Sequence, residues 1–226
     1  MIHNMRVAAL VPMKEHSERV PGKNTRPFSG KPLFHHILGT LERTFAVDVV
    51  VVDTDSQSIA AEAGKLFRKV CVLERPEELC GDMVSMNSVL AYDISQVEAD
   101  IYLQTHATNP LLRSETMTEA LRRFVKCEDC DSLFSVNCYQ SRFYTAEGTP
   151  VNHDPEHLIR TQDLEPIFEE NSALYVFTRA SFGARDRRIG RRPLMFETDR
   201  IEGIDIDDEY TFRLAEMLAG YARGEL

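Results

Sequence analysis

The sequence lacks the features that mark membrane proteins and nucleic-acid-binding proteins. Its longest apolar run, from Val47 to Val52, is interrupted by Asp48 and is far shorter than the roughly 20 residues that a membrane-spanning helix needs. Positive charge is also scarce, because 36 acidic residues against 26 Lys and Arg give a formal net charge of -10. Binding to nucleic acid depends on Lys and Arg that neutralise phosphates. We therefore expect neither a membrane nor a nucleic acid among the partners.

Cysteine is scarce and odd in number. The cysteines are Cys71, Cys80, Cys127, Cys130 and Cys138. Such a scattered set favours reduced thiols in the cytoplasm over a disulfide framework. Cys127 and Cys130 have the spacing of a metal knuckle, but no second Cys or His pair follows at a suitable distance. Surface thiols are the expectation, with zinc or redox use as the alternative. The first six residues lead directly into a predicted strand, so we expect no signal peptide.

The length of 226 residues, with 43% hydrophobic and 27% charged residues, predicts one globular domain spanning 1–226. Short apolar runs predict strands at 6–11, 48–52, 69–73, 100–104, 132–136 and 173–177. Helical periodicity predicts helices at 32–41, 59–66, 85–94, 114–125 and 208–218. Strands that alternate with helices indicate an α/β fold with a mostly parallel, doubly wound sheet. Residues 137–170 are mostly polar without periodicity, which is typical of a lid or of a segment that packs on another subunit.

The loop after the first predicted strand is a candidate phosphate site. Ligands of open α/β sheets bind beyond the carboxyl ends of the strands, and this loop concentrates positive charge in an acidic protein. It contains Lys14, Arg19 and Lys23, with Ser17 as a further donor. Such a set suits a triphosphate, although the loop is not a Walker A motif. A solvated surface turn is the alternative.

A pair of aspartates near the C-terminus is a candidate metal site. Asp205 and Asp207 are two residues apart on a segment predicted to be extended, so both carboxylates project to one face. Paired carboxylates suit Mg²⁺, which takes one or two carboxylates together with substrate phosphates. The alternative is an edge strand that ends in a charged helix cap.

Histidine is the remaining candidate for acid or base chemistry. His16 and His106 lie in predicted ligand loops and are better candidates than His35 and His36, which fall on a predicted helix. A Ser-His-acid arrangement with a recognisable nucleophile elbow is missing, so a hydrolase triad is not supported.

A series of short motifs adds a family resemblance. In chain order they are Pro21-Gly22-Lys23-Asn24, Gly30-Lys31-Pro32-Leu33, Thr54-Asp55, Arg75-Pro76-Glu77-Glu78-Leu79, Leu103-Gln104, Asn109-Pro110-Leu111-Leu112-Arg113, Arg160-Thr161-Gln162-Asp163-Leu164, Glu170-Asn171-Ser172-Ala173-Leu174-Tyr175 and Ile204-Asp205-Ile206-Asp207. With this order the chain resembles the acylneuraminate cytidylyltransferases, also called CMP-sialic acid synthetases, and their relatives that activate other acidic sugars. The resemblance covers nearly the whole chain.

The resemblance implies a Rossmann-like fold of the nucleotide-diphospho-sugar transferase type. It implies a nucleotidyltransferase that moves CMP from CTP to the hydroxyl of an acidic, nonulosonic (sialic-acid-like) sugar, with Mg²⁺ as cofactor and release of pyrophosphate. The alternatives are transfer to 3-deoxy-octulosonate or a small phosphonate, or a non-catalytic nucleotide-binding regulator. The segment 137–170 corresponds to the dimerisation arm of the family. A homodimer with sites completed across the interface is therefore implied.

The resemblance also implies roles for particular residues. Lys14, Lys23 and Asp207 would be catalytic, and Asp205 with Asp207 would hold Mg²⁺. Gln104 and Arg160 would face the acidic sugar. The other implied nucleotide or substrate contacts are Met13, Ser17, Arg19, Asn24, Arg75, Ser85 and Asn171.

The chain departs from the family pattern in two places. Lys14 stands where an arginine is usual, and Glu18 stands where a lysine is common. Lysine cannot reproduce the bidentate grip of arginine, although Arg19 is available beside it. Near the expected sugar site, residues 139–144 lack the His-Pro and Lys of many members. This predicts an acceptor other than sialic acid itself.

Overall fold

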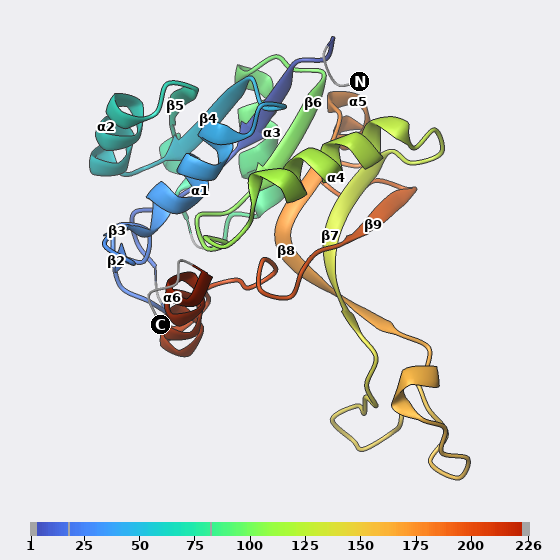
Figure 1. Cartoon of the computed structure of the whole chain (residues 1–226). Coiled ribbons are helices and arrows are strands. Elements are labelled where there is room, and N and C mark those ends of the chain that lie inside the picture. The colour runs from blue at the N-terminus through green and yellow to red at the C-terminus, as the bar shows by residue number, and fades with distance from the viewer. Residues whose placement is uncertain (1–3, 18, 82, 223–226) are drawn as a thin grey trace.

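The computed structural model describes residues 4–17, 19–81 and 83–222 (Figure 1). The strands are β1 (Val7–Leu10), β2 (Pro27–Phe28), β3 (Lys31–Pro32), β4 (Val49–Thr54), β5 (Val70–Glu74), β6 (Ile101–Thr105), β7 (Ser132–Tyr139), β8 (Ile167–Phe177) and β9 (Pro193–Glu197). The α-helices are α1 (Leu33–Arg43), α2 (Gln57–Leu66), α3 (Met86–Gln96), α4 (Ser114–Lys126), α5 (Arg179–Gly183) and α6 (Glu209–Ala222), with short 3₁₀ turns at Glu77–Leu79 and Thr161–Asp163.

Within the described residues, one seven-stranded sheet has the strand order β5-β4-β1-β6-β8-β7-β9. The strands β5, β4, β1 and β6 are parallel neighbours. Strand β8 is antiparallel to both β6 and β7, whereas β7 and β9 are parallel. The prediction of a mostly parallel α/β sheet is confirmed, and the reversal lies in its second half.

Helices cover both faces of this sheet because successive side chains of a strand point to opposite sides. Val7 and Ala9 of β1 join the core cluster that includes the inner faces of α1, α2 and α4. Ala8 and Leu10 join the cluster beneath α3 and α5. Figure 1 shows α1 and α4 on the near side of the sheet and α3 behind it.

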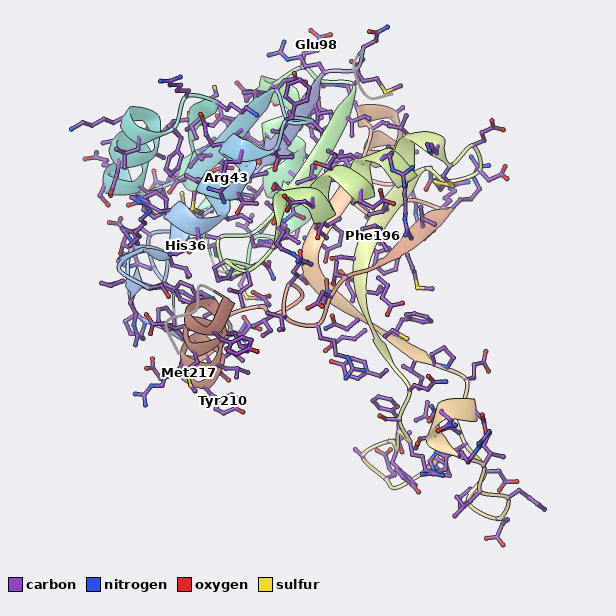
Figure 2. All side chains as sticks on the ribbon, viewed as in Figure 1. His36, Arg43, Glu98, Phe196, Tyr210 and Met217 are labelled. Carbon is purple, nitrogen blue, oxygen red and sulfur yellow. A yellow bond between two sulfur atoms is a disulfide. The ribbon has the colours of Figure 1, made fainter. Side chains whose placement is uncertain are left out.

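A third core cluster attaches the C-terminal helix to the loop after β1. Val20 from that loop packs with Phe28, Leu33 and Phe212. The rings of Phe28 and Phe212 meet edge to face with centroids 5.6 Å apart. On its other side α6 exposes apolar residues, among them Tyr210 and Met217 (Figure 2). Ile206 belongs to the same cluster, so the cluster holds the loop after β1 next to the segment that carries Asp205 and Asp207.

Several predicted elements differ from the structure. The segment 200–207, predicted to be extended, is irregular and is not a strand. The amide of Ile206 bonds to the Thr108 carbonyl at 2.9 Å outside any ladder, and its side chain is buried in the third cluster. Strand β9 and helix α5 were not predicted, because they flank the arginine-rich segment 185–192, whose polarity hides any periodicity.

Strands β7 and β8 continue past the sheet as a two-stranded ribbon, paired from Val136↔Glu170 to Tyr139↔Ile167. Beyond the ribbon, residues 140–166 form the tip of an arm that projects away from the sheet (Figure 1). The tip exposes the apolar side chains of Tyr144, Val151, Leu158 and Ile159. The polar segment 137–170 is therefore an extended arm whose base is regular strand.

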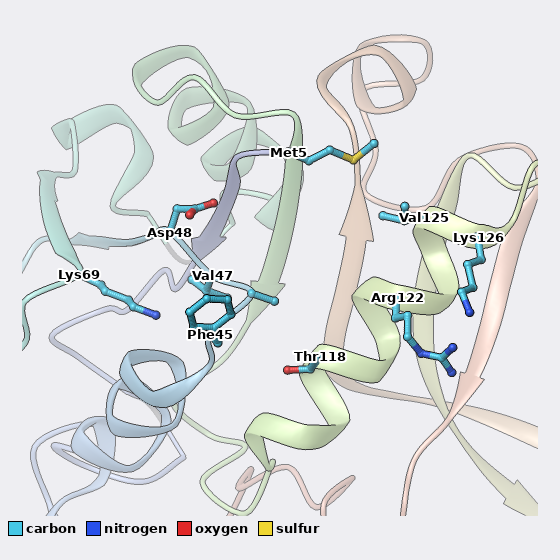
Figure 3. Close-up of a pocket in the computed structure, with 10 residues that line it drawn as sticks. Met5, Phe45, Val47, Asp48, Lys69, Thr118, Arg122, Val125 and Lys126 are labelled. Atoms are coloured by element: carbon cyan, nitrogen blue, oxygen red, sulfur yellow. The ribbon is translucent and has the colours of Figure 1, made fainter. Parts of the chain in front are cut away.

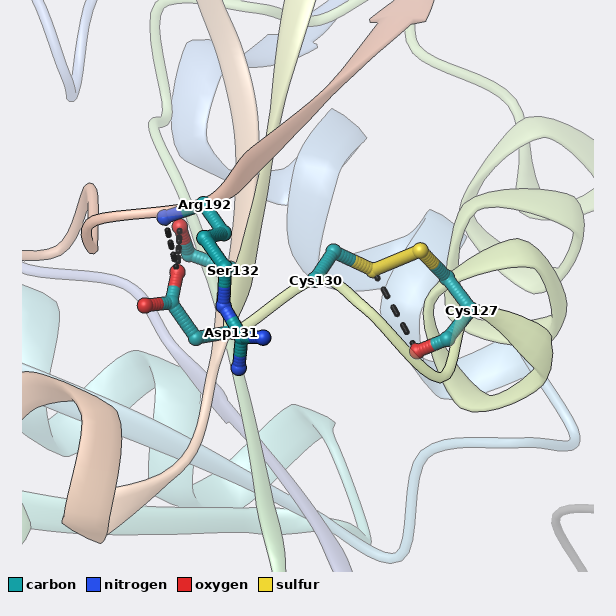
Figure 4. Close-up of a disulfide and its surroundings, with 5 residues drawn as sticks. All are labelled: Cys127, Cys130, Asp131, Ser132 and Arg192. Carbon is teal, nitrogen blue, oxygen red and sulfur yellow. Dashed lines mark hydrogen bonds between the residues drawn. A yellow bond between two sulfur atoms is a disulfide. The ribbon is translucent and has the colours of Figure 1, made fainter.

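The expectation of reduced thiols throughout is wrong at one place. Cys127 and Cys130 form a disulfide (Figure 4). The chain turns back directly after α4, where the amide of Cys127 bonds to two helix carbonyls, and the two Cα atoms lie 5.6 Å apart. This separation is in the normal range for a disulfide. Cys71, Cys80 and Cys138 are free.

Among the described helices, none combines the length and the apolar character that a bilayer-crossing segment requires.

Candidate functional site

A hollow of about 290 Å³ lies at the carboxyl ends of β1 and β6. It brings together six of the residues predicted for nucleotide binding, together with two from the loop after β6. These are Met13, Lys14, Ser17, Arg19, Lys23 and Asn24, with His106 and Thr108. Glu18, one of the two departures from the family pattern, lies outside the described residues.

Backbone and side-chain bonds hold the loop after β1 in shape. The amide of Met13 donates to the Asp53 carbonyl at 2.8 Å, which extends the β1–β4 pairing, and the Met13 side chain is buried in the core. The Asn24 amide donates to the Lys14 carbonyl at 2.8 Å and closes the loop. Lys14 Nζ donates to the Gly81 carbonyl at 3.1 Å. Met13 and Asn24 thus shape the loop, while Lys14 connects it to the loop after β5.

The cations of this loop face the predicted metal residues. Lys23 Nζ donates to the Ile206 carbonyl at 2.7 Å, and Arg19 lies 3.2 Å from the Asp207 carboxylate. Burial lowers the pKa of Lys23, and the charges of Asp205 and Asp207 act in the opposite direction. Lys23 therefore lies close to both carboxylates.

The predicted metal residues Asp205 and Asp207 bring carboxylate oxygens to the edge of the hollow, beside Lys23 and Arg19. Asp205 Oδ1 is buried and has no hydrogen-bond partner among the described residues. Burial raises the pKa of Asp205, and the neighbouring charge of Asp207 adds to this effect. Among the described residues, no group of three or more His, Cys, Asp or Glu side chains is placed to hold a metal ion.

A residue that was not predicted, Arg188, connects to the hollow through Gln104. Arg188 Nη1 donates to the buried Gln104 Oε1 at 2.8 Å. The amide nitrogen of Gln104 must then face His106 Nε2, 2.7 Å away. Since that amide nitrogen is a donor, His106 Nε2 accepts and its proton is on Nδ1.

His106 is consequently a poor general base. Burial lowers its pKa to about 3, with further contributions from the charges of Arg188 and Lys23. It is neutral at pH 7, and its acceptor nitrogen is engaged by Gln104. The role open to His106 is to hold Gln104 in place.

Two predicted residues have mainly structural contacts. Arg75 is buried, and its Nε donates to Asp53 Oδ1 at 2.7 Å. Its guanidinium therefore bonds to Asp53 inside the protein and does not line the hollow. Ser85 caps α3 by accepting from the Ser88 amide at 3.1 Å.

A third predicted residue, Asn171, is a buried hub of hydrogen bonds. It accepts from Ser135 Oγ at 2.6 Å and donates to Asn137 Oδ1 and Thr198 Oγ1 at 2.9 and 2.7 Å. With these bonds its amide is occupied inside the protein. Arg160 is on the arm, paired with Asp163 at 2.7 Å. The structure does not bring these two residues to the hollow.

The Arg75–Asp53 pair is part of a buried acidic network with Asp93. Asp53 Oδ2 and both oxygens of Asp93 are buried and have no donor among the described residues. Burial raises the pKa of Asp93 to about 9, and the adjacent Asp53 contributes. The two carboxyls can meet without repulsion when one of them keeps a proton. The backbone carbonyl of Asp53 accepts the Met13 amide, so the residue that carries this buried carboxyl also supports the phosphate loop.

A larger hollow of about 710 Å³ lies at the opposite, amino-terminal end of β1 and β4 (Figure 3). Phe45 and Lys69 line one side, and Arg122 and Lys126 of α4 line the other. In open α/β sheets ligands bind at the carboxyl ends, so the smaller hollow is the candidate active site.

Known proteins match this chain over nearly its whole length. The sequence profile of a family described as cytidylyltransferase matches residues 8–218. The chain belongs to this cytidylyltransferase family. It is 29% identical to the CMP-N,N'-diacetyllegionaminic acid synthase of Legionella pneumophila, over 95% of this chain and 96% of that protein. It is 27% identical to the pseudaminic acid cytidylyltransferase of Campylobacter jejuni, again over 95% and 96%.

Solved structures agree on the fold of this cytidylyltransferase. A CMP:2-keto-3-deoxy-manno-octonic acid synthetase in complex with CTP superposes with a TM-score of 0.69 at 15% identity, covering 96% of this chain and 99% of that one. The predicted Rossmann-like fold is confirmed, and the protein is a nucleotidyltransferase enzyme.

Proposed function

We propose that this cytidylyltransferase transfers CMP from CTP to a hydroxyl of an acidic sugar of the nonulosonic class. The observation that carries the proposal is Lys23, which joins the cation-rich loop to the aspartate pair through the Ile206 carbonyl. The named relatives that match over nearly the full chain act on legionaminic and pseudaminic acids. This gives the acidic acceptor further support.

In the proposed reaction the sugar oxygen forms a bond to the α-phosphorus of CTP. The bond between that phosphorus and the α–β bridging oxygen breaks, pyrophosphate leaves with the electron pair, and the hydroxyl proton passes to solvent. Lys14, Arg19 and Lys23 would bind the phosphates and neutralise the charge that develops on the leaving group. Phosphoryl transfer depends mainly on such positioning and electrostatic stabilisation.

Magnesium is part of this proposal, held by Asp205 and Asp207. The buried, unpartnered Oδ1 of Asp205 supports it, because a bare carboxylate oxygen is costly to bury without a cation or a donor. A bound Mg²⁺ supplies charge neutralisation at the phosphate oxygens. Arg19 pairs with Asp207 and Lys23 bonds to the carbonyl of Ile206 between the two aspartates, so both cations would help to hold the carboxylates in place beside the phosphates.

We further propose a homodimer formed through the arm. The exposed apolar side chains of its tip, including Val151 and Leu158, would be covered by a second copy. Arg160 belongs to the tip of the arm, directly before the 3₁₀ turn Thr161–Asp163, and does not line the hollow of its own chain. In the dimer it would reach the partner's acceptor site. A Leu158→Asp variant should sediment as a monomer where the unmodified chain sediments as a dimer. An unmodified chain that sediments as a monomer at micromolar concentration contradicts the dimer.

The decisive experiment is a matrix of pyrophosphate-release assays on the purified chain. Each of CTP, UTP, ATP and GTP is offered with legionaminic, pseudaminic or N-acetylneuraminic acid, 3-deoxy-octulosonate, or 2-aminoethylphosphonate, with and without Mg²⁺. Release is expected with CTP, Mg²⁺ and a nonulosonic acid. A higher rate with 3-deoxy-octulosonate or the phosphonate would show that the acceptor belongs to that class instead. No pyrophosphate release under any condition would overturn the catalytic proposal.

A further inference from the structure

The segment 185–192 carries several arginines, of which Arg188 turns inward. Its side chain is 19% exposed, whereas Arg185, Arg187, Arg191 and Arg192 are exposed residues. Long charged side chains are rarely buried without a specific partner. Specific contacts must therefore offset the burial of the Arg188 guanidinium, whereas the exposed arginines beside it need none.

The backbone around Arg188 is fixed by bonds to the side chains of three residues distant in the sequence. The Arg188 amide donates to Asn87 Oδ1 at the start of α3, at 3.3 Å. Two residues on, the Gly190 amide donates to Ser132 Oγ at 2.8 Å. The Asp131 carboxylate accepts the Arg191 amide at 2.9 Å and the Arg192 amide at 3.0 Å (Figure 4). The guanidinium is thus presented from a preorganised loop.

The guanidinium has mostly neutral partners. It stacks on the Tyr175 ring at 3.6 Å, and its Nη2 donates to the Tyr175 hydroxyl at 2.9 Å. Its Nη1 donates to Gln104. Glu170 is the nearest carboxylate, at 3.6 Å, and it also accepts the Tyr175 hydroxyl. The Glu170 carboxylate is shared with the Tyr175 hydroxyl and lies at the long end of an ion-pair distance, so it neutralises the largely buried guanidinium only in part and leaves a site that favours a further anion.

The position of this charge matches the acceptor side of the reaction. Arg188 connects to His106 through Gln104, and His106 and Lys23 line the same hollow. Lys23 belongs to the loop proposed for the triphosphate. Arg188 reaches the same place from the β6–β8 side, through Gln104. An acid placed between them would have its carboxylate at Arg188 and its reacting hydroxyl toward the phosphates.

We infer that Arg188 binds the carboxylate of the acidic acceptor, and that Gln104, Tyr175 and Glu170 hold its guanidinium in the orientation for that contact. This inference rests on the function proposed above. Arginine presents parallel N–H donors that match a carboxylate in a bidentate pair. The same contact discriminates against neutral sugars, which would leave the charge without a partner.

The test compares Arg188→Gln and Arg188→Lys with Arg187→Gln, a matched change at the exposed neighbouring arginine. Steady-state rates are measured while one of three substrates is varied: the nonulosonic acid that gives the highest rate in the assay matrix above, the methyl ester of that acid, or CTP. Arg188→Gln should raise KM for the acid about 10- to 100-fold, with KM for CTP within about twofold. Arg188→Lys keeps the charge but lacks the paired N–H donors of arginine, so its KM for the acid should lie between those of the unmodified enzyme and Arg188→Gln. Arg187→Gln should have the same KM values as the unmodified enzyme.

The methyl ester separates carboxylate binding from a structural role. Replacing the acid by its ester should lower kcat/KM of the unmodified enzyme by about the same factor as the Arg188→Gln change lowers it for the acid. For Arg188→Gln itself, kcat/KM should be nearly the same with the ester as with the acid. Equal losses of Arg188→Gln on acid and ester, or an equal rise in KM for CTP, would overturn the inference while leaving the proposed function intact. If the unmodified enzyme uses no acid at all, both fall. Should Arg188→Gln melt early, Arg188→Lys carries the same comparison.

Discussion

Lys23 Nζ lies 2.7 Å from the carbonyl oxygen of Ile206, a residue 183 positions later in the chain. This contact joins the loop after β1 to the segment between Asp205 and Asp207. Lys23 is partly buried near two carboxylates, so its ammonium helps to hold their charges close to the proposed phosphate site. The arrangement predicts that charge at this position matters more for the reaction than for folding.

Replacement of Lys23 by Met should therefore lower kcat/KM for CTP by about 100- to 1,000-fold, the usual effect of losing one preorganised donor at a charge-developing centre. The melting temperature should change far less than activity. Lys31→Met, at an exposed lysine of the adjacent β3, is the matched control and should keep near-normal kinetics. Similar kinetic losses in both variants would point to general charge effects and against a specific role for Lys23.

Removal of one proposed metal ligand should abolish the response to Mg²⁺. Asp207→Asn should lower kcat by at least about 100-fold, because metal stabilisation of a phosphoryl group is worth several kcal/mol. Stability should change little, since the Arg19–Asp207 pair is solvent-exposed on both sides. The measurement is a magnesium titration of initial rates, with excess EDTA as the zero point.

The adjacent acid provides the control for that titration. Asp208 caps α6 by accepting the Thr211 amide at 2.7 Å. Asp208→Ala should cost about 1 kcal/mol of stability and leave the magnesium dependence unchanged. If Asp208→Ala alters the magnesium midpoint as strongly as Asp207→Asn does, the metal is not held as proposed.

The buried Asp93 should make stability fall as pH rises. Below the unfolded-state pKa near 3.9, both states carry the proton and this group gives no pH dependence. Above it only the folded state keeps the proton, so the free energy of unfolding falls, by up to about 1.4 kcal/mol per pH unit. The fall ends near pH 9, where Asp93 ionises in the folded protein.

Asp93→Asn removes this titration while it keeps the shape of the side chain. Urea unfolding at pH 6, 7 and 8 should show the variant gaining stability relative to the unmodified chain at each step, whatever their difference at pH 6. Asp129→Asn, at an exposed position, should give a curve parallel to that of the unmodified chain. Parallel curves for Asp93→Asn as well would show that Asp93 is ionised in the folded state.

Local pattern was sufficient to predict part of this molecule. The apolar runs of β1, β4 and β6 are buried central strands, and such strands are readable because both of their faces lie in the core. The candidate phosphate loop and the candidate metal pair Asp205 and Asp207 were proposed from charge and spacing, with a surface turn and an edge strand as the alternatives, and the family resemblance added their roles. The structure brings them together through Lys23.

The remaining features depend on contacts between distant residues. Nothing local distinguishes Arg188 from the other arginines of its segment, and its inward turn depends on Ser132, 58 residues before Gly190. Arg75 carries the same kind of charge, yet it is committed to Asp53 in the core. The family resemblance predicted Arg75 and Asn171 as ligands, but the side chains of both are bonded inside the protein. Such burial cannot be read from a short motif.

Gly203 offers a test of how the buried amide hub positions the metal residues. A Cβ at this glycine would lie 2.4 Å from Asn137 Oδ1 and 2.6 Å from Asn171 Nδ2. These two atoms belong to amides that already bond to each other at 2.9 Å, so they cannot easily move apart. Gly203→Ala should destabilise the protein by about 1–3 kcal/mol and displace the segment that leads into Asp205. The magnesium concentration for half-maximal rate should rise accordingly.

The matched control is Gly183→Ala, since a Cβ at Gly183 in α5 meets nothing within 4 Å. That change should be neutral or stabilising by up to about 1 kcal/mol, because alanine is the better helix former. Urea unfolding and magnesium titration of both variants give the comparison. A Gly203→Ala variant that is destabilised but keeps the normal magnesium midpoint would show that the hub supports the fold without setting the position of Asp205.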